Sequence, residues 1–403
     1  MIHYRAGWVV PVSNPPFRNG WIAVDHDRIA AVAKHRPDDG SPAVDLGDDV
    51  AVLPGLVNAH THLELSYMRD EVAPADDFVT WVRGVMAARR RRPDPASPEI
   101  LQAVTDAIDD AVAFGTAVVG DISNTLVTFA PLTRAPLAAV VFYELIRFNA
   151  ADPHGFVEAA VNEIEALGPT ERVRASLAAH APYSVAPLVF RAIRKAVDRA
   201  PFAPCSVHLS ESAEEIEFIR SGGGPWRTLL EELGAWDPKW VPPGCSPVQF
   251  LDQSGFLDPS IVAVHGVQMT SADLHRLAAR GCTLVTCPRS NGYTGAGAPP
   301  IADFYRSGVR VAIGTDSLAS CADLNVFAEL ATMRALAPHV SAAALVESAT
   351  IQGARALGFD ADYGTIEPGK RARLLAVTVP PRVYDVEEYL VGGIEPDQIR
   401  WVE

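Results

Sequence analysis

The chain has 403 residues and a formal net charge of −15, and this acidity argues against a nucleic-acid or anionic-membrane partner. Its length suits one α/β barrel with a smaller appended domain. The five cysteines lack paired spacing, no apolar stretch is long enough to span a bilayer, and the first residues do not resemble a signal peptide. We expect a cytoplasmic protein with reduced thiols that acts on a small molecule.

Both ends of the chain are rich in short β-prone segments. The strand-like runs lie at residues 7–10, 20–24, 28–33 and 372–377. We interpret residues 1–52 and 360–403 as one small β-sandwich domain that both chain ends form together. Residues 53–359 then form the second domain.

This second domain alternates between apolar runs typical of buried strands and segments with helical spacing. Seven predicted strands follow the one that ends at His60 and His62, and they cover residues 115–121, 138–145, 173–180, 206–208, 261–265, 282–287 and 309–316. Strands that are apolar on both faces and separated by helices predict a parallel sheet. Eight such units predict a (β/α)8 TIM-like barrel.

Histidines end several of these strands. His60 and His62 are one residue apart on a strand, so both imidazoles point to the same face and form half of a divalent-metal site. By itself this pair is equally consistent with two polar histidines in a loop. Other predicted strands end in a histidine or an aspartate, namely at His180, His208, His265 and Asp316. Because barrel enzymes place their working residues where strands end, we expect these side chains to share one site.

Six motifs together resemble the amidohydrolase superfamily, and within it the deaminase and chlorohydrolase branch that includes cytosine, guanine, adenosine-type and aminofutalosine deaminases. The motifs are PGLVNAHTH at 54–62, HAPYS at 180–184, HLSE at 208–211, HG at 265–266, CPRSN at 287–291 and GTDS at 314–317. The resemblance covers nearly the whole chain. It implies a barrel hydrolase that acts on carbon–nitrogen bonds other than peptide bonds, and a homodimer.

The resemblance also implies one divalent metal ion, Zn²⁺ or Fe²⁺, with four ligands. These ligands are His60, His62, His208 and Asp316. Members with two metals add a carboxylated lysine from the fourth strand. Here that strand ends in His180 with no lysine nearby, so we expect one metal. An open position on the ion would hold water and lower the pKa of that water.

Glu211 is implied as the proton shuttle, His265 as the hydrogen-bond partner of the attacking water, and Asp316 as both ligand and proton acceptor. Glu211 lies three residues after His208, where a continued strand would turn it away, so a turn must follow His208. The alternative is a surface glutamate beside Glu214. Because some chlorohydrolases of the branch lack this glutamate, its presence favours loss of ammonia over loss of chloride.

The implied reaction is hydrolytic deamination of an amino-substituted N-heterocycle: an aminopurine, an aminopyrimidine or a nucleoside such as aminofutalosine. Water activated by the metal attacks an amidine-like ring carbon, Glu211 protonates the adjacent ring nitrogen, and ammonia leaves. A chlorohydrolase or amidase with the same site is the alternative. A non-catalytic binding or scaffold relative is more remote, because all four ligands, Glu211 and His265 are present.

Substrate contacts are less constrained by the sequence. The candidates are His180, Glu64, Trp81, Arg289, Ser290 and Asn291. His180 is equally consistent with a structural hydrogen bond. Glu64 and Trp81 are equally consistent with residues that only pack or are solvated. Ser290 and Asn291 are also consistent with orienting a loop. The insertion at residues 221–250 either covers the pocket mouth or is a plain surface segment.

Overall fold

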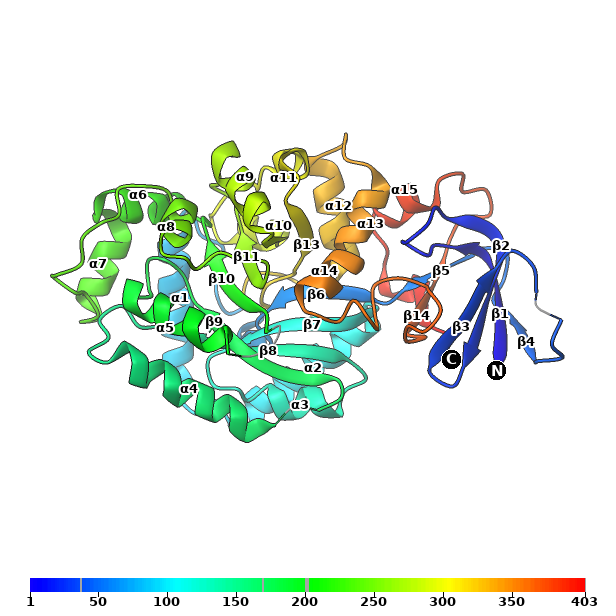
Figure 1. Ribbon diagram of the computed structural model, residues 1–403, viewed down its shortest axis with the longest axis horizontal. Coiled ribbons are helices and arrows are strands. Elements are labelled where there is room, and N and C mark those ends of the chain that lie inside the picture. The colour runs from blue at the N-terminus through cyan, green and yellow to red at the C-terminus, as the bar shows by residue number, and fades with distance from the viewer. Residues whose placement is uncertain (37, 169, 200–202, 403) are drawn as a thin grey trace.

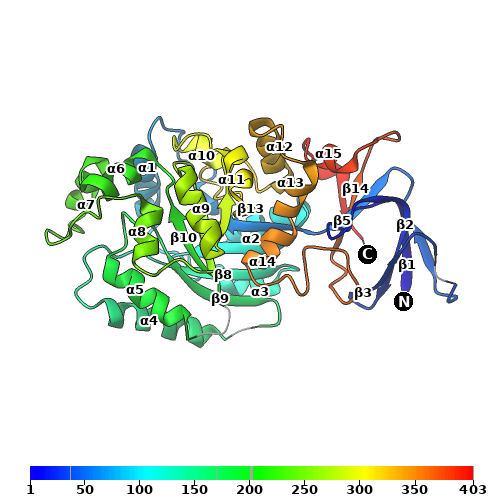
Figure 2. The same ribbon diagram turned by 45° about the horizontal axis from the view of Figure 1, so that its top comes forward.

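The computed structural model describes residues 1–36, 38–168, 170–199 and 203–402. This part of the chain contains an eight-stranded and a seven-stranded sheet, which lie beside each other along the long axis of the molecule (Figure 1). The seven-stranded sheet holds the first strand and the last strand of the chain. Helices α6 and α7 lie at the opposite end of the molecule (Figure 2).

The larger sheet consists of eight parallel strands in sequence order. They are β6 (Leu56–Thr61), β7 (Thr116–Ser123), β8 (Ala138–Leu145), β9 (Val173–Ala179), β10 (Cys205–Leu209), β11 (Ile261–His265), β12 (Thr283–Thr286) and β13 (Arg310–Ile313). Nearly all of their residues are buried, as expected of parallel strands covered by helices on one face and filled by side chains on the other. The predicted eight-stranded barrel is confirmed.

The first and last strands of the barrel meet near the functional residues. Thr61 forms a parallel bridge with Asp316, whose backbone N–H donates to the His60 carbonyl at 3.0 Å. The Asn58 amide donates to Thr315 Oγ1 at 2.7 Å and accepts from the Thr315 backbone at 3.1 Å. The seam between β6 and β13 therefore brings together two motifs that lie more than half of the chain apart.

Helices surround the barrel on its outer side (Figure 1). They are α1 (Phe78–Arg91), α2 (Pro98–Ala113), α3 (Phe129–Arg134), α4 (Pro153–Leu167), α5 (Pro187–Val197), α6 (Ala213–Ser221), α7 (Gly224–Glu232), α8 (Pro247–Gln253), α9 (Ser271–Arg280), α10 (Pro288–Tyr293), α11 (Ile301–Ser307), α12 (Val326–Leu336), α13 (Ala342–Ser348) and α14 (Ile351–Ala356), with a 3-10 segment, η1, at Leu63–Met68. Helix α9 shows why such segments begin and end where they do. Thr270 and Asp273 form a capping box at its start, and Gly281 ends it in the left-handed conformation.

The smaller sheet combines both ends of the chain. Its strands are β1 (Ile2–Val9), β2 (Phe17–Asp25), β3 (Arg28–Ala33), β4 (Ala43–Asp45), β5 (Val50–Pro54), β14 (Leu374–Thr378) and β15 (Ile399–Trp401), and the short helices α15 (Val386–Leu390) and η2 (Pro396–Gln398) lie in the C-terminal segment. Strand β5 pairs with β1 on one side and with β14 on the other, so it joins the two ends of the chain. The pairing of both ends is confirmed, whereas domain limits at 52/53 and 359/360 stay a prediction. Among the described residues, no helix combines the length and apolar character needed to span a bilayer.

Candidate active site

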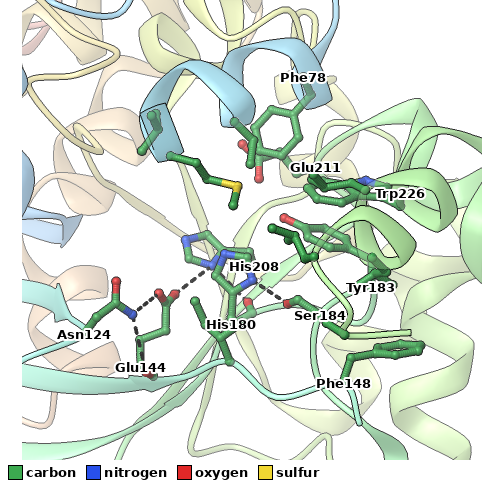
Figure 3. A pocket seen from close by; sticks show the side chains of 18 of the residues that line it. Phe78, Asn124, Glu144, Phe148, His180, Tyr183, Ser184, His208, Glu211 and Trp226 are labelled. Carbon is green, nitrogen blue, oxygen red and sulfur yellow. Dashed lines mark hydrogen bonds and ion pairs between the residues drawn. The ribbon is translucent and has the colours of Figure 1, made fainter. Parts of the chain in front are cut away.

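A cavity of about 650 Å³ opens where the barrel strands end, a size typical of small-molecule sites. Its floor is polar and its upper walls are mostly apolar. The floor includes His62, Glu144, His180, His208, Glu211, His265 and Asp316, and the walls include Phe78, Trp81, Met86, Phe148, Tyr183, Trp226 and Leu229. Figure 3 shows His180, His208 and Glu144 with Phe78 and Trp226 above them.

A cluster of imidazoles and one carboxylate lies at this floor. One ligand atom from each of His60, His62 and Asp316 lies within 4.8 Å of the others, and the same holds for His60, His208 and His265. His60 is fully buried, yet neither of its ring nitrogens has a hydrogen-bond partner among the described residues. Because buried polar atoms are normally paired, these orphaned nitrogens fit a site for a metal ion.

The protonation state of the cluster suits metal ligation. Burial lowers the pKa of His62 and of His208 to about 4 and lowers the pKa of His60 well below its ordinary value, so all three rings are neutral near pH 7. His208 Nδ1 donates to the carbonyl oxygen of His180 at 2.9 Å, which leaves Nε2 for a ligand. Three neutral imidazoles and one carboxylate are a donor set for a divalent ion such as zinc.

Asp316 is held in place by its own backbone and by a serine. Its φ of +62° lies in the left-handed region, three residues after the end of β13 at Ile313. Ser290 Oγ donates to Asp316 Oδ2 at 2.6 Å, and Oδ1 lies 3.5 Å from His62 Nε2. One carboxylate oxygen is thus occupied by the serine while the other faces the imidazoles.

The turn required after His208 is present. Ser210 adopts a φ of +53°, and the buried carboxylate of Glu215 accepts the backbone N–H groups of Ser210 and Glu211, both at 2.9 Å. This turn places Glu211 in the cavity, with Oε1 3.5 Å from His265 Nε2. Burial, reinforced by the Asp316 and Glu215 charges, raises the pKa of Glu211 well above its ordinary value.

Comparisons with known proteins agree with this site. Residues 51–394 match the model of the amidohydrolase family. The chain belongs to this family. The resemblance of its motifs is thereby confirmed, and the protein is a metal-dependent hydrolase of carbon–nitrogen bonds other than peptide bonds.

Among its amidohydrolase relatives, the aminodeoxyfutalosine deaminase of Deinococcus radiodurans is 32% identical over 322 residues, which cover 76% of this chain and 73% of the relative. The 5-methylthioadenosine/S-adenosylhomocysteine deaminase of Moorella thermoacetica is 29% identical over 408 residues, or 95% of this chain and 88% of the relative. A crystal structure of a zinc-bound adenosine deaminase from Xanthomonas campestris superposes with a TM-score of 0.82 at 28% identity, covering 99% of this chain and 90% of that chain.

Four predicted substrate contacts of this amidohydrolase lie outside the cavity lining. The Arg289 guanidinium pairs with Asp323 at 2.8 Å and with Glu329 at 2.7 Å, so its charge is already compensated. Ser290 bonds to Asp316, and the Asn291 amide donates to His265 Nδ1 at 3.0 Å. These two residues orient the site, which corrects their expected role as substrate contacts.

Glu64 is the fourth correction. Its buried carboxylate accepts hydrogen bonds from Ser123 and Thr125 and forms an ion pair with Arg89 at 2.9 Å. These bonds occupy both carboxylate oxygens below the cavity wall. By contrast, the structure places Trp81 and His180 in the lining, and His180 Nδ1 lies 2.5 Å from Ser184 Oγ.

The lining also includes residues outside the predicted substrate contacts. The insertion at residues 221–250 supplies Trp226 to the wall, where its ring stacks on Tyr183 with centroids 3.7 Å apart, so the insertion borders the cavity. Glu144 was also missed, although it lies at the end of a predicted strand. The rule that selected the histidines would have selected it had it been applied to carboxylates at every strand end.

Proposed function

We propose that this amidohydrolase is a zinc-type deaminase that hydrolyses the exocyclic amino group of an aminopurine nucleoside. The observation that carries this proposal is the convergence of Glu211, His265 and Asp316 beside the buried imidazole cluster. A nucleoside fits the size of the cavity, and deaminases of such compounds are among its relatives. The apolar wall suits a flat heterocycle and its substituents.

A divalent ion held by His60, His62, His208 and Asp316 would acidify a water molecule and polarise it for attack. Glu211, whose raised pKa favours the protonated form, gives a proton to the ring nitrogen next to the reacting carbon. His265 Nε2 hydrogen-bonds the attacking oxygen, since Asn291 occupies Nδ1.

The proton balance is complete with these groups. Water adds to the carbon that bears the amino group, and Asp316 takes one water proton. This proton passes to the amino group, the carbon–nitrogen bond breaks, and ammonia leaves. Glu211 regains a proton from the hydroxyl on the same carbon as the carbonyl forms.

The test is ammonia release by the zinc-loaded protein from a panel of aminopurines, aminopyrimidines and their nucleosides. Glu211→Gln keeps the side-chain shape but cannot shuttle a proton, so kcat should fall by at least about 100-fold with unchanged zinc content. Glu217→Gln, an exposed glutamate on α6, is the matched control and should retain activity.

Absence of turnover across the panel by protein with one bound zinc would contradict deamination. It would favour chloride or amide hydrolysis by the same residues. Equal activity of Glu211→Gln and wild type would contradict the proposed proton shuttle.

We also infer a cytoplasmic homodimer. The family resemblance supports the dimer, and the five free cysteines, four of them buried, support a reducing compartment. Sedimentation of the purified protein gives the oligomeric state directly.

A further inference from the structure

Glu144 is a buried carboxylate in the cavity that the proposed chemistry does not use. It lies near the end of β8, and its side chain is 3% exposed. Its Oε2 accepts from Asn124 Nδ2 at 2.8 Å, whereas Oε1 has no hydrogen-bond partner among the described residues. A buried carboxylate oxygen without a donor is unfavourable, and such an atom in a cavity indicates a missing ligand group.

The orientation of Glu144 is set by its neighbours. Arg89 Nη1 donates to Asn124 Oδ1 at 2.6 Å, so the Asn124 amide must present its NH₂ group to Glu144. Arg89 itself is tied to Glu64. This chain of bonds holds the Glu144 carboxylate in one position at the cavity lining, with Oε2 bonded to Asn124 and Oε1, a buried atom, directed toward His208 (Figure 3).

His180 and His208 each have a ring nitrogen within 4.8 Å of a Glu144 carboxylate oxygen, and the contact with Oε1 is made by His208. Its Nδ1 lies 3.4 Å from Glu144 Oε1 but already donates to the His180 carbonyl at 2.9 Å. A ring nitrogen carries only one proton, and the shorter bond takes most of it. The contact therefore leaves Oε1 with unused accepting capacity.

The place of Glu144 in the barrel indicates which part of a substrate reaches it. Of the reacting groups, Glu211 follows β10 and His265 ends β11, whereas Glu144 belongs to β8, with β9 in between. A heterocycle with its amino carbon at Glu211 and His265 would direct its substituent toward β8. In a nucleoside this substituent is the sugar, whose hydroxyl groups are hydrogen-bond donors.

We propose that Glu144 is a specificity-determining residue, whose Oε1 accepts a hydrogen bond from a sugar hydroxyl of the substrate. This inference rests on the proposed deamination of a nucleoside. A site built around a buried acceptor discriminates strongly against an analogue that lacks the donor, because the acceptor is then left unpaired.

The experiment compares adenosine, 2′-deoxyadenosine and 3′-deoxyadenosine as substrates of zinc-loaded wild type, Glu144→Gln and Glu144→Ala. The dissociation constants of inosine and its two deoxy forms are measured in parallel, because product binding requires no chemistry. In wild type, removal of the recognised hydroxyl should lower kcat/KM by about 10- to 100-fold, which is the effect expected from the loss of one hydrogen bond to a charged group. In both variants this preference should shrink to within about threefold, with zinc content unchanged. Glu163→Gln, an α4 carboxylate that accepts from the Tyr143 hydroxyl, is the matched control and should keep the wild-type preference.

The outcomes separate this inference from the proposed function. Hydroxyl-dependent binding of the inosine series without turnover of adenosine would overturn the deamination and support the role of Glu144. Turnover with no hydroxyl preference, or with the same preference in the variants, would overturn the role of Glu144 alone. Loss of zinc in Glu144→Gln would also overturn it, because Glu144 would then act through His208. Neither binding nor turnover of any nucleoside would overturn both.

Discussion

At the scale of single residues, Asp316, His265 and His208 each have one polar side-chain atom occupied by a neighbour. Ser290 bonds to one oxygen of Asp316, Asn291 to one nitrogen of His265, and the His180 carbonyl to one nitrogen of His208. The atoms that remain free all face one region of the cavity floor. Such partners set the tautomer and orientation of ligands before any ion or substrate binds.

Burial of neutral histidines predicts acid sensitivity of the metal-free protein. Burial lowers the pKa of His180 to about 4, whereas an unfolded histidine titrates near 6.5. In the window between these two values the unfolded state binds more protons, so the free energy of unfolding falls as the pH falls through it. His180→Gln should reduce this slope in urea unfolding of the metal-free protein measured between pH 7 and pH 5.

The matched variant is His154→Gln, since the His154 side chain is 62% exposed. It should keep the wild-type slope. An equal slope in His180→Gln and wild type would contradict the prediction.

At the scale of elements, the connection from β10 to α6 determines where Glu211 lies. A strand that continued past His208 would direct Glu211 away, but the left-handed Ser210 reverses the chain there. Glu215, in the first turn of α6, holds the reversal by accepting two backbone N–H groups. The proton shuttle is therefore positioned by a carboxylate that does not line the cavity.

We predict that Glu215→Ala lowers kcat by about 10- to 100-fold while KM and zinc content stay near wild type, because the turn loosens without loss of a ligand. Glu215→Gln retains one accepting oxygen and should restore part of the activity. Steady-state kinetics with metal analysis make the measurement. A change in KM or metal content with unchanged kcat would show that Glu215 acts on the fold as a whole rather than on Glu211.

At the scale of the whole molecule, closure of the barrel assembles the metal site. His60 lies on the first strand β6, His62 directly follows it and Asp316 follows the last strand β13, and the bridge between Thr61 and Asp316 brings the two strand ends together. Gly314 lies at this seam, where only glycine fits. A Cβ at this position would lie 2.6 Å from the His60 carbonyl oxygen and 2.7 Å from His60 Cβ. The seam requires this close approach.

Gly314→Ala should therefore push β13 away from β6. We expect a loss of about 1–3 kcal/mol in the free energy of unfolding, as for other overpacked sites. Zinc affinity should fall as well, because Asp316 moves with β13. The measurements are urea unfolding and zinc competition with a chelator.

Gly292→Ala is the control, because a Cβ at Gly292 meets nothing within 4 Å. It should leave stability and zinc affinity near wild type. Unchanged zinc affinity in Gly314→Ala would show that the seam does not position Asp316.

The sequence by itself determined the order of elements and the chemistry of the strand ends. Apolar runs separated by helices predicted the barrel, because strand alternation and chain order are local properties. The resemblance of the motifs implied His60, His62, His208 and Asp316 as ligands. Only the tertiary structure decided which polar residues face the cavity. Arg289 lies at a helix start and was expected to bind substrate. In the folded chain its guanidinium instead forms ion pairs with Asp323 and Glu329. Glu144 lies near the end of a predicted strand, but the lack of a hydrogen-bond partner for its Oε1 is evident only from the folded positions of Asn124 and His208. The position of a residue at a strand end can be predicted from the local sequence. Whether its polar atoms are hydrogen-bonded cannot, because the partners lie far away in the chain.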